Sequence, residues 1–393
     1  MQLSNVEQDT VSILKYALNP QQETPPKITS SWADILRELS VQTVEGLVEN
    51  SLSLLGVSKE EKIRYAREFG NSIRYFHSIL NEQDVLAKTL GEVEYVVLKG
   101  TAAAMYYPRP EIRKMGDIDI LVRPEEYEHA ESLLEQSGYL KQKESARHSS
   151  FRKESGIQIE LHRKFSSSQN EDLNDILDGM LYGAIPERKL QEVCGHCVPV
   201  LPTLENGIVL LGHINGHLSG GLGLRQIVDW MMYVRENLDD AFWNESFRSA
   251  AEAIGLRQLA EVSTLLCRRH LGLEGISWCD SADESLADEM LEYVLGKGNF
   301  GRKNELSSNK TVFVLHKFAN PVSIFKYLTA GGMIHWKAAR EHRILKPFAW
   351  IYQVGHLVKM GLSRKISLST FIREMKQSRR ETDFLDKVNV TYK

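Results

Sequence analysis

Two aspartates separated by one residue are the strongest chemical signal in this sequence. Asp117 and Asp119 lie in the short apolar segment 117–122 (DIDILV), which predicts a strand. Residues i and i+2 of a strand point to the same face, so the two carboxylates should project side by side. Neighbouring carboxylates repel each other unless a cation neutralises them, and oxygen ligands on a rigid strand suit Mg²⁺ or Mn²⁺. The pair predicts a metal site, and a solvated strand edge is the alternative.

A glycine turn upstream could bind phosphate. A valine-rich strand is predicted to end at Lys99-Gly100, and Thr101 begins a helical segment. The N-terminus of a helix offers free backbone N–H groups to an anion. Lys99 and Arg113 could add positive charge. The alternatives are a solvated lysine at a strand end and an ion pair between Arg113 and a nearby acid.

A third carboxylate lies on a later predicted strand. Apolar and polar residues alternate over 157–162 (IQIELH), which is typical of a half-buried strand. Glu160 is on its polar face and is a candidate to bind a second metal ion and help activate a nucleophile. His162 shares that face and is a further candidate site residue. A hydrogen-bonded structural histidine is the alternative.

Three zones of different periodicity must position these residues. Residues 1–90 read as helical, with Ser58 as an N-cap and Glu61 at the capping-box position. Residues 91–200 mix short strands with helices. Residues 201–393 show no convincing strand. Helices are predicted there at 225–234, 242–271, 282–295 and 347–360, and a surface loop at 298–310. The pattern predicts an α+β fold.

Composition excludes several classes of protein. The chain has 393 residues, 42% hydrophobic and 25% charged, which excludes a disordered, collagenous or disulfide-stapled chain. Lys and Arg number 48 against 52 Asp and Glu, so no global basic field favours nucleic acid. Four cysteines suit a reducing cytoplasm. The first residues lack the pattern of a signal peptide, and the longest uncharged stretch, 206–224, is too polar for a membrane span. We expect a cytoplasmic protein without a membrane span.

Two further motifs have weaker functional interpretations. The segment 194–197 (CGHC) has the spacing of a redox pair, but extended chain follows it where a redox helix should begin, and no second pair completes a zinc site. A turn between two strands is predicted instead. His213 and His217 would share one face of a helix, and this spacing could suit a metal ion with Asp229 as a further ligand. The glycines around the two histidines favour an irregular segment instead. We therefore expect a structural or pocket-lining role rather than metal binding.

Positive charge is concentrated in residues 337–380. Eleven Lys and Arg against two Glu give a local charge of 11 − 2 = +9. Such a segment could contact a nucleic acid, an anionic lipid or an acidic partner. A solvated face is the alternative, and it is the interpretation we favour.

The sequence resembles the nucleotidyltransferase superfamily of DNA polymerase β, and more closely a bacterial branch of uncharacterised nucleotidyltransferases. The resemblance rests on Leu98-Lys99-Gly100, Tyr107-Pro108, the block 113–122 (RKMGDIDILV) and Glu160-Leu161-His162. It extends into the helical zone through 213–230 and 347–352. It implies a nucleotidyltransferase-type mixed sheet with flanking helices, an N-terminal helical segment (1–90), a catalytic core (91–200) and a C-terminal all-α lobe (201–393).

The resemblance also implies an activity. A nucleoside monophosphate would pass from an NTP such as ATP to an acceptor oxygen, and pyrophosphate would leave. The implied Mg²⁺ (or Mn²⁺) ligands are Asp117, Asp119 and Glu160. The implied nucleotide-binding residues are Lys99, Gly100, Thr101, Arg113 and His162. The chain departs from the family at Thr101, where serine or glycine is usual, and in a longer gap from Thr101 to Asp117.

The expected partners are an NTP and an unidentified acceptor, which could be a small molecule, a glycan precursor or a peptide. The acceptor is expected between the core and the helical lobe. One alternative is a catalytically silent nucleotide-binding or regulatory module, suggested by the Thr101 departure. Another is a nucleic-acid-directed transferase that uses the basic segment 337–380; nucleic acid is not the favoured acceptor.

Overall fold

The computed structural model describes residues 3–19, 24–53, 55–154, 156–166, 170–218, 220–301 and 303, and beyond these only parts of 325–363 and residues 383–388. The chain divides into two compact units, one of residues 1–303 with 388–393 and one of residues 304–387. All candidate site residues lie in the first unit. The finer division at residues 90 and 200 stays a prediction.

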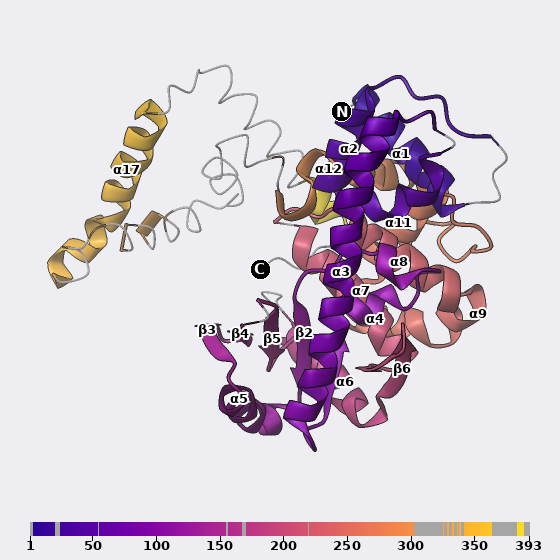
Figure 1. The fold of residues 1–393 in the computed structure, drawn as a ribbon. Coiled ribbons are helices and arrows are strands. Elements are labelled where there is room, and N and C mark those ends of the chain that lie inside the picture. Colours follow the sequence, from indigo (N-terminus) through magenta and orange to yellow (C-terminus); the bar gives the residue numbers. More distant parts are fainter. Residues whose placement is uncertain are drawn as a thin grey trace. The chain divides into compact units, whose positions relative to one another are not determined.

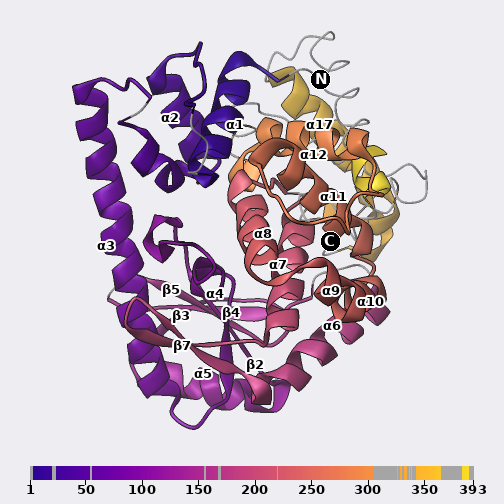
Figure 2. The same ribbon diagram turned by 90° about the vertical axis from the view of Figure 1, so that its right-hand side faces the viewer.

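The N-terminal zone is helical, as predicted. It contains α1 (Asn5–Leu18), α2 (Trp32–Val41), the 3₁₀ turn η1 (Glu45–Ser51) and α3 (Lys59–Leu90). The predicted capping box is confirmed, because the Ser58 side chain accepts from the Glu61 N–H and the Glu61 side chain accepts from the Ser58 N–H. At 1.5 Å per residue the 32 residues of α3 span about 48 Å. Figure 2 shows α3 running from α1 and α2 down to the sheet.

A five-stranded mixed sheet lies beside α3 in the lower part of the first unit as drawn in Figure 1. Its strand order is β1-β2-β5-β4-β3, and only the β2–β5 pair is parallel. The strands are β1 (Tyr95–Leu98), β2 (Ile118–Val122), β3 (Leu140–Glu144), β4 (His148–Arg152) and β5 (Gln158–His162). The parallel pair requires a crossover, which is supplied by η3 (Pro124–Glu126), α5 (Tyr127–Gln136) and the β3–β4 hairpin.

The two faces of the sheet differ in polarity. Alternate residues of the central strands join the hydrophobic core with α3 and α5: Ile118, Ile120, Val122, Phe151, Ile159 and Leu161. The residues between them include Asp119, Glu160 and His162, which therefore occupy the opposite face. The alternation predicted for 157–162 is confirmed. The division is clearest in β5, where Ile159 and Leu161 pack in the core and Glu160 lies on the opposite face.

A separate hairpin follows α6 (Glu171–Ala184) and the 3₁₀ turn η4 (Ile185–Glu187). It pairs β6 (Lys189–Val193) with β7 (His196–Val200) through the two-residue turn Cys194-Gly195. The predicted turn between two strands is confirmed. Cys194 and Cys197 are exposed free thiols.

The following zone is helical, but two details of the prediction were wrong. Residues 213–217 are not irregular, because α7 (Thr203–Leu218) runs through them. Its glycines permit close packing: a Cβ on Gly207 would lie 2.3 Å from Cζ of Tyr233 on α8 (Leu224–Asn237). The helix predicted at 242–271 is divided, because Gly255 has φ +71° between two of its parts. The segments are α9 (Asp240–Phe242), η5 (Trp243–Phe247), α10 (Arg248–Ala253), α11 (Arg257–Leu266) and η6 (Cys267–Leu271).

The helix predicted at 282–295 is α12 (Glu284–Lys297), followed by the short turn η7 (Asn299–Gly301). In the second unit, the helix predicted at 347–360 is confirmed as the 3₁₀ turn η8 (Arg343–Phe348) followed by α17 (Ala349–Ser363). Most of the predicted loop 298–310 and most of the Lys and Arg residues of the basic segment 337–380 lie outside the described residues. Among the residues described, no helix is both long and apolar enough to cross a bilayer.

Candidate active site

The parallel pairing of β2 and β5 brings two of the predicted carboxylates together. Asp119 is the register partner of Glu160, so both side chains rise from the same face of the sheet. Asp117 comes directly before β2, next to Gly116, whose carbonyl accepts a hydrogen bond from the Tyr75 hydroxyl of α3 at 2.8 Å. Burial and then repulsion by Asp119 and Glu160 raise the pKa of Asp117 to about 6. The three acids are therefore electrostatically coupled.

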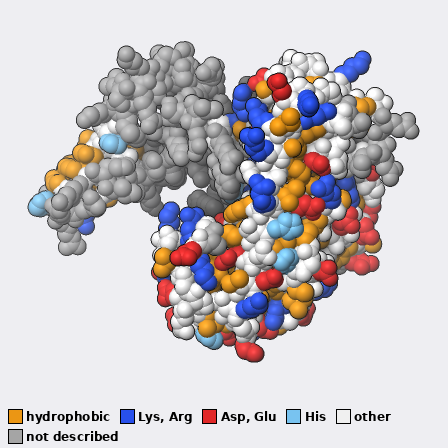
Figure 3. Space-filling view, in the orientation of Figure 1, with side chains coloured by type: hydrophobic (Ala, Val, Ile, Leu, Met, Phe, Trp, Pro, Cys, Tyr) orange, Lys and Arg blue, Asp and Glu red, His pale blue; other side chains and the backbone are white. Residues whose placement is uncertain are grey.

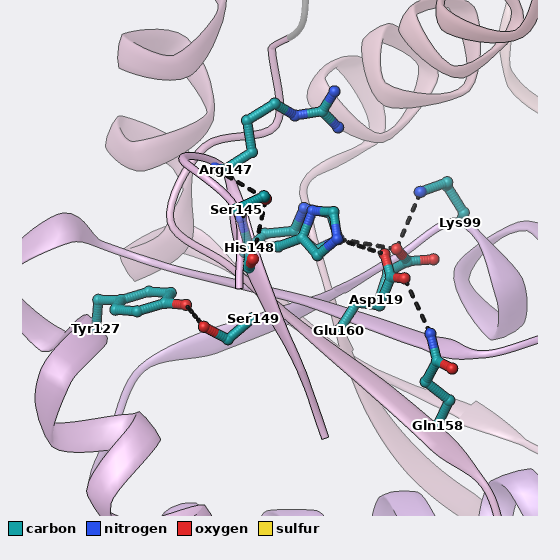
Figure 4. Close-up of polar contacts among 10 residues, drawn as sticks. Lys99, Asp119, Tyr127, Ser145, Arg147, His148, Ser149, Gln158 and Glu160 are labelled. Carbon is teal, nitrogen blue, oxygen red and sulfur yellow. Dashed lines mark hydrogen bonds and ion pairs between the residues drawn. The ribbon is translucent and has the colours of Figure 1, made fainter. Parts of the chain in front are cut away.

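Asp119 is the best stabilised anion of the three. It is 5% exposed, and its Oδ1 is 3.0 Å from Lys99 Nζ and 2.9 Å from His162 Nε2 (Figure 4). Burial alone would raise the pKa of this carboxyl, but Lys99 and His162 overcome it and hold the pKa well below its usual range. Burial alone would lower the pKa of His162, but its contacts with Asp119 and Glu160 overcome that effect and raise the pKa.

Glu160 is held from both sides. Gln158 Nε2 donates to its Oε1 at 3.1 Å, and its Oε2 is 3.6 Å from His162 Nε2. The nearby His162 imidazole is the main reason that the pKa of Glu160 is lowered. Figure 4 shows Lys99, Asp119, Glu160 and Gln158 converging on one place at the sheet.

A second histidine at this place was missed by the sequence analysis. His148 on β4 is the register partner of His162, and its Nε2 is 3.7 Å from Glu160 Oε2. Residues 148–152 (HSSFR) contain one apolar residue, Phe151, so no polar and apolar alternation indicates a strand there. The pairing of His148 with His162 is a matter of strand register, which a local sequence pattern does not encode.

The predicted phosphate-binding turn lies beside the carboxylates. Lys99 has φ +55° and Gly100 φ +38°, and a Cβ on Gly100 would lie 3.8 Å from the Asp117 carbonyl oxygen. The helix α4 (Gly100–Ala104) begins there. The Thr101 hydroxyl is buried and accepts from Gln83 Nε2 at 2.9 Å. Backbone N–H groups, and not this hydroxyl, are the donors that the turn can offer to a phosphate.

Arg113 has a different partner from the other predicted site residues. Its Nε and Nη2 each donate to a carboxylate oxygen of Asp229 on α8 at 2.7 Å, and the Tyr107 hydroxyl donates to the same carboxylate. Both charged side chains are buried, at 3% and 1% exposed. The guanidinium is therefore engaged in a structural ion pair, which was the alternative interpretation of Arg113.

His213 and His217 lie on α7, with ring centroids 4.5 Å apart. Burial, then the neighbouring His217 and Lys99, lower the pKa of His213 well below its usual range. Lys99, which contacts Asp119, is one of the charges that act on His213. Within the described part of the chain the two histidines belong to no three-ligand cluster.

The donor set fits a divalent cation. Asp117, Asp119 and Glu160 supply hard oxygen atoms, and the repulsion that raises the pKa of Asp117 would be relieved by positive charge. The carboxylates do not all converge as tightly as a closed metal site requires. An ion there would need further ligands, which the phosphates of a nucleotide can supply.

Comparison with known proteins adds one match. A family model described as "Uncharacterised nucleotidyltransferase" matches residues 29–272, more than half of the chain, and this span includes every candidate residue named above. No curated protein and no solved structure matches this chain.

Proposed function

Because this chain belongs to the uncharacterised nucleotidyltransferase family, we propose that it transfers a nucleoside monophosphate from an NTP to an acceptor hydroxyl or phosphate, with release of pyrophosphate. The proposal includes membership of the DNA polymerase β-like superfamily and action in the cytoplasm. It rests above all on the pairing of Asp119 with Glu160 on adjacent parallel strands, with Asp117 beside them.

In this proposal Asp117, Asp119 and Glu160 hold Mg²⁺ or Mn²⁺. A bound ion would neutralise the phosphate charge and polarise the reacting phosphoryl group. Oxygen donors favour such hard cations. The raised pKa of Asp117 shows that its negative charge is unfavourable beside Asp119 and Glu160, and a bound cation would offset that repulsion.

The chain's own residues position the reactants. The backbone amides at Gly100 and Thr101 bind nucleotide phosphate at the start of α4. Lys99 and His162 keep Asp119 ionised and correctly oriented. When the acceptor is a hydroxyl, its O–H donates a hydrogen bond to Glu160 Oε2, and this carboxylate helps to remove the hydroxyl proton.

The proposed acceptor is a small molecule, a glycan precursor or a peptide. A nucleic-acid acceptor would depend on the basic segment 337–380, most of whose Lys and Arg residues lie outside the described residues. On the face seen in Figure 3, several Lys and Arg side chains lie close together in the upper part, and acidic and hydrophobic side chains cover much of the rest. The formal net charge of -4 offers a long polyanion no global basic field, which favours a small acceptor.

A second candidate function is nucleotide binding without turnover. Three groups expected to bind phosphate already have protein partners: Lys99 contacts Asp119, Thr101 contacts Gln83, and Arg113 contacts Asp229. A silent module would bind Mg²⁺–NTP and release no pyrophosphate with any acceptor.

The test is thermal stability with each NTP, with and without Mg²⁺, in wild type and in Asp117→Asn. A ligand at a hundred times its Kd stabilises a protein by about 2.7 kcal/mol. We expect a Mg²⁺-dependent shift with at least one NTP that is lost in Asp117→Asn. Asp117 is the better target because Asp119 is buried in ion pairs. A substitution at Asp119 would destabilise the fold, so a lost thermal shift could not be assigned to lost nucleotide binding.

The matched control is Glu135→Gln, an exposed carboxylate on α5. It should shift as wild type does. Pyrophosphate release across an acceptor panel then separates transfer from silent binding. A protein that no NTP stabilises in the presence of Mg²⁺ would contradict both candidate functions.

A further inference from the structure

Two histidines and one carboxylate converge where β4 meets β5. His148 and His162 lie opposite each other in antiparallel register, with ring centroids 4.9 Å apart. Glu160 is two residues before His162 and shares its face of the sheet. One ligand atom from each of the three lies within 4.8 Å of the other two, and no other three His, Cys, Asp or Glu side chains among the described residues do so.

The distances are close to those of a metal centre. A zinc-like ion bonds imidazole nitrogen at about 2.0–2.1 Å and carboxylate oxygen at about 2.0–2.2 Å, so ligand atoms around it lie about 3.3–3.6 Å apart. Glu160 Oε2 is 3.6 Å from His162 Nε2 and 3.7 Å from His148 Nε2. The ligand nitrogens of the two histidines lie within 4.8 Å of each other, so the two rings would also have to turn toward one ion for all three atoms to bond it.

The surroundings permit those rotations. The Nδ1 atoms of His148 and His162 are buried and make no hydrogen bond, so no bond at Nδ1 holds either ring against a small rotation. His162 Nε2 now contacts Asp119 Oδ1, and Lys99 would still hold that oxygen if the imidazole turned to an ion. The His148 side chain is 28% exposed, which leaves solvent access for an ion and for a further ligand.

The ligand chemistry selects the class of ion. Mg²⁺ prefers oxygen ligands and keeps most of its water, whereas imidazole nitrogen suits first-row transition metals. We propose that His148, Glu160 and His162 form a binding site for a divalent transition-metal ion. The inference goes beyond the proposed function, since ion binding here requires no nucleotide. The two meet at Glu160, which both sets of ligands share.

The experiment uses full-length, tag-free protein that has been stripped with a chelator and titrated with Co²⁺. Cobalt in a four- or five-coordinate site with nitrogen ligands absorbs strongly in the visible range, so the bands report occupancy. We expect wild type to develop these bands and to keep them in excess Mg²⁺. His148→Ala should bind Co²⁺ at least tenfold more weakly. The control His129→Ala removes an exposed histidine of α5 and should behave as wild type.

Three further measurements keep the proposal falsifiable. If His148→Ala does not fold, His148→Gln replaces it, and X-ray absorption of cobalt-loaded wild type should show two imidazole ligands. Absence of visible bands, or equal Co²⁺ affinity in wild type and the folded His148 variant, would overturn the site. Asp117→Asn should lose the Mg²⁺–NTP response and keep the cobalt bands. A protein with cobalt bands and no NTP response would overturn the proposed function alone.

Discussion

Asp117 and Asp119 are the same residue type two positions apart, yet their surroundings shift their pKa values in opposite directions. Lys99 and His162 both contact Asp119 and keep it ionised. Asp117 is partly buried near two other carboxylates, so its charge is opposed by burial and by repulsion, and its pKa rises to about 6. Neighbouring carboxylates whose pKa values are shifted in opposite directions are typical of functional sites.

At this scale we predict that Asp117→Asn stabilises the metal-free protein at pH 7. The folded pKa is above the value of 3.8 for an unperturbed carboxyl, so the ionised group costs stability above pH 6. Removing the charge should raise the free energy of unfolding by about 1–3 kcal/mol at pH 7. The gain should shrink as the pH falls through 6, because the wild-type carboxyl then takes up its proton, and should vanish below pH 4.

Urea denaturation in the presence of a chelator, at several pH values, measures this effect. Glu135→Gln provides the control, since this exposed carboxylate lies on α5 away from the three acids. A destabilised Asp117→Asn at pH 7, or a difference that does not change with pH, would show that repulsion at Asp117 is not the dominant force.

The β6–β7 hairpin shows how an element is determined by its turn. Cys194 has φ +50° and Gly195 φ +85°, and Val193 pairs with His196 on either side. Two-residue hairpin turns with both φ values positive match the right-handed twist of the strands. Glycine adopts this backbone freely, whereas cysteine pays a steric cost. The Cys194-Gly195 turn is therefore built from one well-suited and one poorly suited residue.

We predict that Cys194→Asn stabilises the protein by about 0.5 kcal/mol, because asparagine tolerates the left-handed region. The β-branched change Cys194→Val should cost about 1 kcal/mol, since its Cβ substituents clash in that conformation. Thermal denaturation under reducing conditions measures both effects. Cys197→Ser is the matched control on β7 and should change stability little. Equal stability of the Asn and Val variants would contradict this account of the turn.

Across the whole first unit, a buried ion pair joins segments far apart in the sequence. Arg113 precedes β2, and Asp229 lies on α8, 116 residues later. The Tyr107 hydroxyl adds a third contact at 2.7 Å to the same carboxylate. Both charges are almost fully buried, so each needs the other. The pair therefore connects the segment that precedes β2 with the helical zone.

We predict that Asp229→Asn or Arg113→Met destabilises the protein by about 3–5 kcal/mol, because one buried charge is left without its partner. The double variant Arg113→Met/Asp229→Leu should recover part of that loss, since neither charge remains. Urea denaturation of the two singles and the double gives the coupling free energy.

Arg37→Met is the control for this cycle, because Arg37 pairs with Asp34 at an exposed place where solvent screens the interaction, so its loss should change the free energy of unfolding far less than the loss of a buried charge. A cost as small as this for Asp229→Asn would mean that the buried pair does not hold the two segments together.

Local patterns in the sequence predicted much of the fold. The alternation over 157–162 predicted β5 and its polar face, the Ser58–Glu61 spacing predicted the start of α3, and the short apolar run after Asp117 predicted β2. Each depends on periodicity or on an interaction within one turn, which neighbouring residues encode directly.

Contacts between distant segments could not be predicted in this way. The sequence placed Asp119, Glu160 and His162 on polar faces, but only the tertiary structure decided that Asp119 lies beside Glu160 and that His148 meets His162. It also decided that Arg113 pairs with Asp229 and that the glycines of α7 serve close packing. The physical reason is that strand register and burial depend on the packing of the whole chain, while helix and strand periods depend only on neighbours.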